Sequence, residues 1–170
     1  MESTPEKMNM QARLYHLHDE AGTTALGAAL ARVLIPGLCL HLNGTLGAGK
    51  TALTRAILHA AGHTGRVKSP TYNLVEIYPL QLEGETISLF HFDLYRMQNP
   101  EEFMEAGFRE HFDGHNICIV EWPEKGEPLL PAADLNLALT LAGDGREVKL
   151  AALSVQGHQC LARLKFAPNL

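Results

Sequence analysis

The feature of this chain that most restricts its fold is a glycine-rich segment at residues 44–51, GTLGAGKT. It follows the short apolar run LCLHL at 38–42 and precedes good helix formers that extend to about residue 61, before Gly62. The segment matches the pattern GxxxxGK[ST] at every fixed position, and a strand, this turn and a helix in that order form a phosphate-binding loop (P-loop). The sequence therefore predicts an α/β protein that binds a nucleoside triphosphate.

Phosphate binding requires each residue type in this loop for a chemical reason. Glycines allow the backbone to turn tightly and to direct its N–H groups at phosphate oxygens. A helix that starts near Lys50 presents the positive end of its dipole to the same anion. Lys50 is expected to neutralise the β- and γ-phosphates, and the Thr51 hydroxyl is expected to ligate magnesium. The expected nucleotide contacts in this segment are Gly44, Leu46, Gly47, Ala48, Gly49, Lys50, Thr51 and Ala52.

Two acidic residues end apolar runs that are typical of strands. Asp93 ends the run LFHF at 89–92, and Glu121 ends the run ICIV at 117–120. Because the C-terminal ends of parallel strands meet at one edge of a sheet, where ligands bind, both carboxylates are expected to face the phosphates. With Lys50 they form the expected catalytic set, in which Asp93 or Glu121 orients the attacking water. His91 alternates with Asp93 and is equally compatible with a buried core histidine.

A further candidate is Thr71, in the segment SPTY at 69–72. This segment follows the helix of the P-loop, where loops that sense the nucleotide often lie. A serine and a threonine around a proline are also typical of an ordinary turn. The residues alone leave both interpretations open.

The remaining patterns predict a single α/β domain over residues 1–170, with about residues 1–12 flexible. Apolar runs predict strands at 14–18, 38–42, 73–80, 86–93 and 116–121, and a hairpin of 135–141 with 147–153. Helices are predicted at 24–35, with Asp19 offering an N-cap before it, and at 50–61, 100–106 and 159–164. Strands interleaved with helices favour a three-layer sandwich with a mainly parallel central sheet, like that of P-loop NTPases, to which the C-terminal hairpin adds antiparallel strands.

Composition argues against several classes of protein. No apolar run approaches the ~20 residues of a membrane span, and the polar start of the chain lacks the core of a secretory signal. The expected location is therefore the cytoplasm. The formal net charge of −5, from 14 Lys and Arg against 19 Asp and Glu, argues against tight, autonomous binding of RNA or DNA. Cys39 and Cys118 lie in apolar stretches, which favours buried hydrophobes over catalytic or metal-binding thiols.

Four motifs together carry a family resemblance. LNGTLGAGKT, KSPTYNLVEIY, FHFDLYR and CIVEWPE, in this order and spacing, resemble the bacterial TsaE family, also called YjeE. The resemblance extends from about Glu20 to the turn at 145–147 and is far more specific than the P-loop pattern alone. Members of that family are small ATPases required, with TsaB and TsaD, to make threonylcarbamoyladenosine (t6A) beside the tRNA anticodon. The resemblance thus implies ATP and Mg²⁺ as ligands, a TsaB–TsaD complex as partner, and tRNA reached only through these partners.

The resemblance also assigns roles to residues. The magnesium ligands fall on Thr51 and Glu121, and the strand-end aspartate falls on Asp93. The switch motif falls on residues 69–72. The further residues expected to border the nucleotide are Glu20, Thr71, Asp93, Trp122 and Arg146. The sequence departs from the family pattern at Asn43, Thr45 and Asn73, and none of these removes a group that the mechanism needs.

Three other interpretations use the same loop. A small-molecule kinase needs an acceptor pocket and a lid, and no arginine-rich lid segment is apparent. A GTPase is disfavoured because the chain has no [NT]KxD tetrapeptide and no DxxG after the strand that ends at Asp93. A scaffold that uses ATP only as a conformational latch needs the same P-loop, so the sequence does not separate it from an ATPase.

Overall fold

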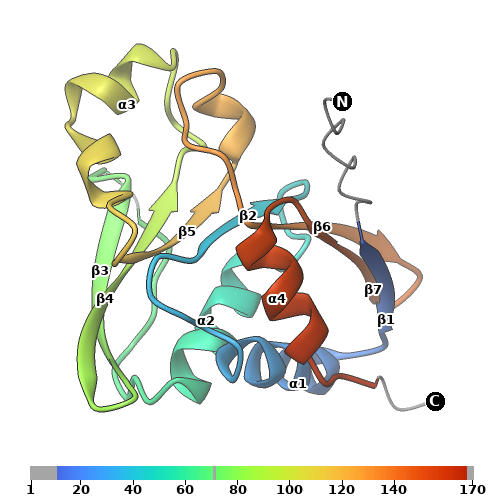
Figure 1. The fold of residues 1–170 in the computed structure, drawn as a ribbon. Helices are drawn as coiled ribbons and strands as arrows, with labels where there is room; N and C mark the ends of the chain where they lie inside the picture. Colours follow the sequence, from blue (N-terminus) through green and yellow to red (C-terminus); the bar gives the residue numbers. More distant parts are fainter. Residues whose placement is uncertain (1–10, 71, 168–170) are drawn as a thin grey trace, which may run out of the picture.

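A computed structural model describes residues 11–70 and 72–167, and its strands form one seven-stranded sheet in the order β1-β7-β6-β2-β5-β4-β3 (Figure 1). The strands are β1 (Ala12–Leu17), β2 (Cys39–Asn43), β3 (Val75–Leu82), β4 (Glu85–Asp93), β5 (Ile117–Glu121), β6 (Leu135–Ala142) and β7 (Gly145–Ala152). The helices are α1 (Glu20–Ala31), α2 (Lys50–Ala60), α3 (Glu101–Glu105) and α4 (Val155–Arg163), with 3₁₀ turns η1 (Phe108–His111) and η2 (Pro123–Lys125). The expected flexibility near residues 1–12 lies largely outside the described residues, and Ala12 already belongs to β1.

The centre of the sheet is parallel, as predicted. Strand β2 pairs in parallel with β5 and β6, and β5 pairs in parallel with β4. Strands β6 and β7 form the predicted antiparallel hairpin. The structure adds two antiparallel pairs that the sequence analysis does not specify, β3 with β4 and β1 with β7. The first follows from a two-residue turn in which Glu83 and Gly84 both have positive φ, 50° and 80°, as tight hairpins require.

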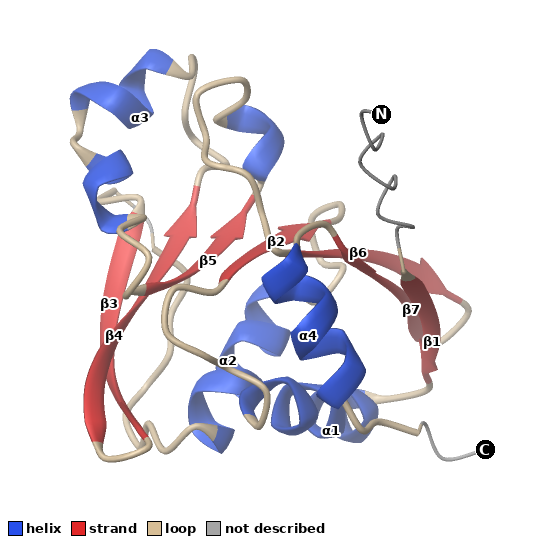
Figure 2. Ribbon diagram, viewed as in Figure 1, coloured by secondary structure: helices blue, strands red, loops and turns tan. Residues whose placement is uncertain are grey.

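Three of the helices, α1, α2 and α4, cover one face of the sheet, and α3 with the 3₁₀ turn η1 covers part of the other (Figure 2). Alternate residues of the strands, such as Leu40 and Leu42 of β2, pack with α1, α2 and α4 in one large apolar core. The intervening residues, such as Phe92 of β4, pack in a second cluster with Phe103 of α3 and Phe108 of η1. The period-2 alternation of strand side chains thus produces the three-layer arrangement that was predicted.

Two helices start earlier in the structure than the sequence predicts. Asp19 caps α1 as expected, accepting a hydrogen bond from the Gly22 N–H at 3.0 Å, but the helix starts directly after it. Helix α4 starts at Val155, four residues before the predicted position, because Ser154 accepts from the Gly157 N–H at 2.9 Å. Within the described part of the chain, no helix is long and apolar enough to cross a membrane.

The strand order brings three chain segments to one edge of the sheet. The loop after β2 lies beside the C-terminal ends of β5 and, beyond it, β4. In the β4–β5 ladder Asp93 lies directly opposite Glu121. The fold therefore gathers the glycine loop and both strand-end acids at this edge.

Candidate nucleotide site

The glycine loop is tightly enclosed by its neighbours. Gly49 has a φ of 105°, and a Cβ at this position would lie 2.5 Å from Nη1 of Arg146. A Cβ at Gly44 would lie 2.7 Å from the carbonyl oxygen of Leu139 in β6. Only glycine allows these approaches, so the loop is held between α2 and the β6–β7 hairpin.

The side chain of Lys50 folds back onto the part of the loop that precedes it. The residue is only 5% exposed, and its ammonium group donates hydrogen bonds to the carbonyl oxygens of Gly44 and, at 3.2 Å, Thr45. Its Nζ also lies 3.9 Å from the ring centroid of Trp122. Burial lowers the pKa of Lys50, and the Glu121 carboxylate opposes that shift. The loop and the ring thus surround a single ammonium group at the edge of the sheet.

The place of the Trp122 ring beside Lys50 depends on an unusual backbone conformation at Trp122. It directly follows Glu121, and its φ of 58° lies in the left-handed region that bulky residues rarely adopt. This conformation turns the chain at the end of β5 into η2, with the indole ring over Lys50. Strained residues of this kind cluster at functional sites, so the turn is an independent indication of a binding site here.

The two strand-end acids have different partners. Thr51 Oγ1 lies 3.0 Å from Glu121 Oε1 and 3.2 Å from Oε2, to which it donates. Asp93 Oδ2 accepts a 2.6 Å hydrogen bond from the Ser69 hydroxyl, and its Oδ1 accepts from the Tyr95 N–H at 3.0 Å. Glu121 is 2% exposed, whereas Asp93 is only partly buried. Thr51 and Glu121 thus form one oxygen pair, while Asp93 connects to the segment at 69–72.

One open cavity of about 240 Å³ contains most of the residues predicted for the phosphates. Its predicted lining residues are Leu46, Gly47, Ala48, Gly49, Lys50, Thr51, Ala52, Asp93, Glu121 and Trp122. Gly44 is not among them, but its carbonyl oxygen accepts the hydrogen bond from Lys50. The structure therefore brings together residues that the sequence analysis collected from three separate motifs.

A second cavity of about 340 Å³ adjoins the first, and Ala52 lines both. It lies between α1 and α2 and is lined by Glu20, Thr23 and Arg146, among others. Glu20 and Arg146 were predicted to border the nucleotide, and both fall in this cavity. Thr23 was not predicted; its buried hydroxyl finds no hydrogen-bond partner in the described residues, a feature that no sequence pattern could reveal.

The SPTY motif contains one predicted site residue and one that was not predicted. Thr71 lies outside the described residues, so its predicted contact stays a prediction. Ser69 belongs to the same motif, was not singled out, and is the residue that reaches Asp93. The SPTY motif itself was the signal that could have identified it.

Thr51 and Glu121 offer the kind of oxygen ligands that magnesium prefers. Magnesium usually takes one or two protein oxygens and completes its shell with phosphates and water. The Thr51 hydroxyl and the Glu121 carboxylate are within hydrogen-bond distance of each other beside the loop, so the residues fit such an ion. Over residues 11–70 and 72–167 there is no cluster of three or more His, Cys, Asp or Glu side chains arranged to hold a metal.

The cysteines are buried, as predicted for Cys39 and Cys118. All three are free thiols, and burial raises the pKa of each, that of Cys118 to about 12. Thiols with raised pKa values are poor nucleophiles. They act as small core side chains.

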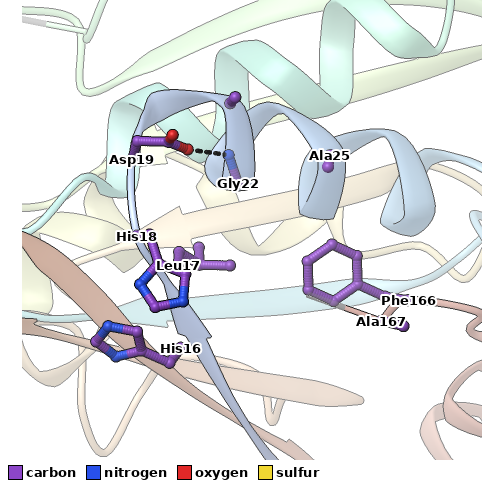
Figure 3. A pocket seen from close by; sticks show the side chains of 9 residues that line it. His16, Leu17, His18, Asp19, Gly22, Ala25, Phe166 and Ala167 are labelled. Carbon is purple, nitrogen blue, oxygen red and sulfur yellow. Dashed lines mark hydrogen bonds between the residues drawn. The ribbon is translucent and has the colours of Figure 1, made fainter. Parts of the chain in front are cut away.

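A further hollow, of about 170 Å³, lies at the junction of β1 and α1 (Figure 3). It is lined by His16, His18 and Phe166, and the two imidazole rings meet at 4.5 Å between centroids. The Asp19 carboxylate at its rim is the α1 cap. None of the predicted site residues lines this hollow.

The strand order, the glycine loop between β2 and α2, and the acids that end β4 and β5 define an α/β fold of the P-loop NTPase type. A crystal structure of Bacillus subtilis YdiB matches with a TM-score of 0.75 at 29% identity, covering 91% of this chain and 95% of that one. The model of the family described as threonylcarbamoyl adenosine biosynthesis protein TsaE matches residues 17–148. The chain therefore belongs to the TsaE family, which takes part in t6A biosynthesis.

Curated relatives agree with this assignment. The TsaE protein of Haemophilus influenzae is 39% identical over 158 residues, which cover 90% of this chain and 98% of the relative. The TsaE protein of Bacillus subtilis is 36% identical over 149 residues, which cover 87% of this chain and 90% of the relative. Both are described as tRNA threonylcarbamoyladenosine biosynthesis proteins, so the resemblance inferred from the four motifs is correct.

Proposed function

We propose that the chain binds Mg-ATP at this site, hydrolyses it slowly, and thereby supports t6A modification of tRNA together with TsaB and TsaD. The observation that carries the proposal is the convergence of Lys50, Thr51, Asp93 and Glu121 around one open cavity beside the glycine loop. Family membership supports the pathway, and the cavity supports the ligand.

The two adjoining cavities suggest how the nucleotide lies. The triphosphate fits the cavity beside the loop, where the amides, the α2 dipole and Lys50 favour an anion. The nucleoside fits the cavity between α1 and α2, where Glu20, Thr23 and Arg146 provide polar groups. The guanidinium of Arg146 against Gly49 lies at the boundary between the two.

In this proposal Glu121 and Asp93 have different roles in hydrolysis. Thr51 and Glu121 would hold magnesium, which would supply positive charge beside the phosphates. Glu121 is almost fully buried and its carboxylate is already paired with Thr51, so it has little access to a water molecule in the cavity. Asp93 is more exposed, lines the cavity, and is the residue that orients the attacking water.

The decisive experiment compares Lys50→Ala with a control, Lys149→Ala, which changes an exposed lysine of β7 that lines neither cavity. Lys50→Ala is expected to lower affinity for Mg-ATP by at least about tenfold, because a charge-assisted contact to phosphate is worth about 1.5–3 kcal/mol. Lys149→Ala should bind as the wild type does. Titration calorimetry measures both, and unchanged affinity in Lys50→Ala would refute the proposal.

Hydrolysis is then measured with and without TsaB and TsaD. A slow basal rate that these partners increase is the expected result, because a partner often completes the set of groups that stabilise the transition state. Transfer of the γ-phosphate to a small acceptor would indicate a kinase instead. A Glu121→Ala variant that still supports tRNA modification would indicate that ATP acts only as a latch.

A further inference from the structure

His91 is a polar residue in an apolar position. It lies on β4 on the same face as Ile87 and Leu89, and all three are 0% exposed. Burial of a polar ring costs free energy unless its nitrogens find partners. Among the residues that the structure describes, Nδ1 of His91 has no hydrogen-bond partner. An aliphatic side chain would fill this place at lower cost, so packing alone does not account for the histidine.

The one partner of the ring is the Glu121 carboxylate. In the parallel ladder His91 lies opposite Ile119, which places Glu121 two residues further along the neighbouring strand, on the same face. Nε2 of His91 hydrogen-bonds to Oε2 of Glu121. Since Nδ1 has no acceptor to serve, the ring proton is assigned to Nε2, which donates it to the carboxylate.

Glu121 is thus held from two directions. The Thr51 hydroxyl approaches its oxygens from α2, on the side of the cavity, and the His91 ring approaches from within the sheet. A carboxylate on a long side chain has several rotamers, and two fixed donors select one of them. The His91 contact remains available when Thr51 turns its oxygen toward another group.

We propose that His91 is a positioning residue, which holds the Glu121 carboxylate in the orientation that accepts magnesium beside Thr51. This inference rests on the proposed function, because it assigns the supporting residue of the same magnesium–nucleotide site. Partners behind a metal-ligating carboxylate orient it, and their loss typically lowers metal affinity about 10- to 100-fold. His91 does not touch the nucleotide, so its loss should leave metal-free nucleotide binding intact.

The test uses the full chain and three variants. His91→Leu removes the donor and keeps an apolar filling like that of Leu89. His91→Gln replaces Nε2 with an amide that reaches about as far and can still donate. The control is His41→Leu, which removes another buried histidine, one on β2 that lies on the face opposite to Leu42, the residue paired with Glu121.

Two affinities separate positioning from folding. ATP affinity is measured in the presence of a chelator, and the affinity of Mn²⁺ for the protein–ATP complex is measured by electron paramagnetic resonance. His91→Leu is expected to bind Mn²⁺ about 10- to 100-fold more weakly and to change metal-free ATP affinity less than twofold. His91→Gln should recover most of the loss, and His41→Leu should match the wild type in both.

Each other outcome has a definite meaning. Wild-type Mn²⁺ affinity in His91→Leu would overturn the positioning role while leaving the proposed function intact. Failure of the wild type itself to bind ATP or Mn²⁺ would overturn the proposed function, and this inference with it. Should His91→Leu not fold, His91→Asn replaces it, because its shorter amide cannot reach Glu121; Mn²⁺ affinity equal to that of His91→Gln would then refute the role.

Discussion

His41 is a buried histidine with a different environment from His91. It lies on β2, on the face opposite to Leu40 and Leu42, and it is 6% exposed. Burial lowers its pKa from 6.5 to about 4, although a hydrogen bond with the Pro131 backbone and the charge of Asp134 act in the other direction. The folded protein therefore keeps this ring neutral over a range in which the unfolded chain protonates it.

The depressed pKa of His41 predicts a loss of stability in mild acid. Between pH 6.5 and about 4 the unfolded chain binds a proton that the folded chain does not, so the free energy of unfolding falls as the pH falls. The full shift corresponds to about 3 kcal/mol. His41→Leu should remove this contribution. Urea unfolding of both proteins at neutral pH and near the lower end of the window measures it, and parallel pH profiles would contradict the assignment.

At the scale of helices, α1 and α2 approach each other closely at one glycine. A Cβ at Gly27 would lie 2.3 Å from the Cβ of Ala56 and 2.9 Å from its carbonyl carbon. The two helices also form the walls of the cavity proposed for the nucleoside. Their spacing therefore affects both the core and that cavity.

Gly27→Ala tests this close approach. Alanine favours a helix over glycine by about 1 kcal/mol, but the added methyl must separate α1 from α2, so we expect a net destabilisation of about 1–3 kcal/mol. The matched control is Gly22→Ala in the same helix, where the nearest atom to the new Cβ is the Leu17 Cβ at 3.3 Å. Thermal unfolding compares them. Equal stability of the two variants would show that the helices separate at no cost.

The elements near the glycine loop could be predicted from the sequence because their signals are local. The apolar run at 38–42, the loop at 44–51 and the helix after it depend on neighbouring residues, and each is confirmed within one or two positions. Pairing of β1 with β7 joins distant segments, so no local pattern specifies it. The contact of His91 with Glu121 depends on the register of β4 and β5. For that reason the sequence alone does not decide whether His91 belongs to the site or to the core.

At the scale of the whole molecule, one apolar core connects β1, the first described strand, with α4, the last described helix. Its buried residues include Leu17 of β1, Leu30 of α1, Ile57 of α2, Leu89 of β4 and Cys160 of α4. Helix α4 packs beside α1 and α2 on the same face of the sheet (Figure 1). This core and the second cluster, which includes Phe92 and Phe103, lie on opposite faces of the same sheet, so we expect the sheet and its helices to unfold together.

The shared core predicts a single cooperative unfolding transition, as expected for one domain of this size. Trp122, the only tryptophan in the sequence, reports on the site, and far-ultraviolet circular dichroism reports on all helices and strands. Their urea midpoints should coincide, and Mg-ATP should raise both by the same amount. A fluorescence midpoint well below that of the dichroism would indicate separate units and contradict a single domain.

The hairpin of β6 and β7 has a consequence for how the chain can be altered. Its turn, between Ala142 and Gly145, precedes Arg146, whose guanidinium lies against Gly49, while the Gly145 backbone lies against the carbonyl of Leu17. Surface turns usually accept tags, insertions or new termini with little effect. Here an insertion, a tag or a new terminus would move the β6–β7 hairpin, which lies against the glycine loop. A chain altered at this turn would therefore fold with a distorted site.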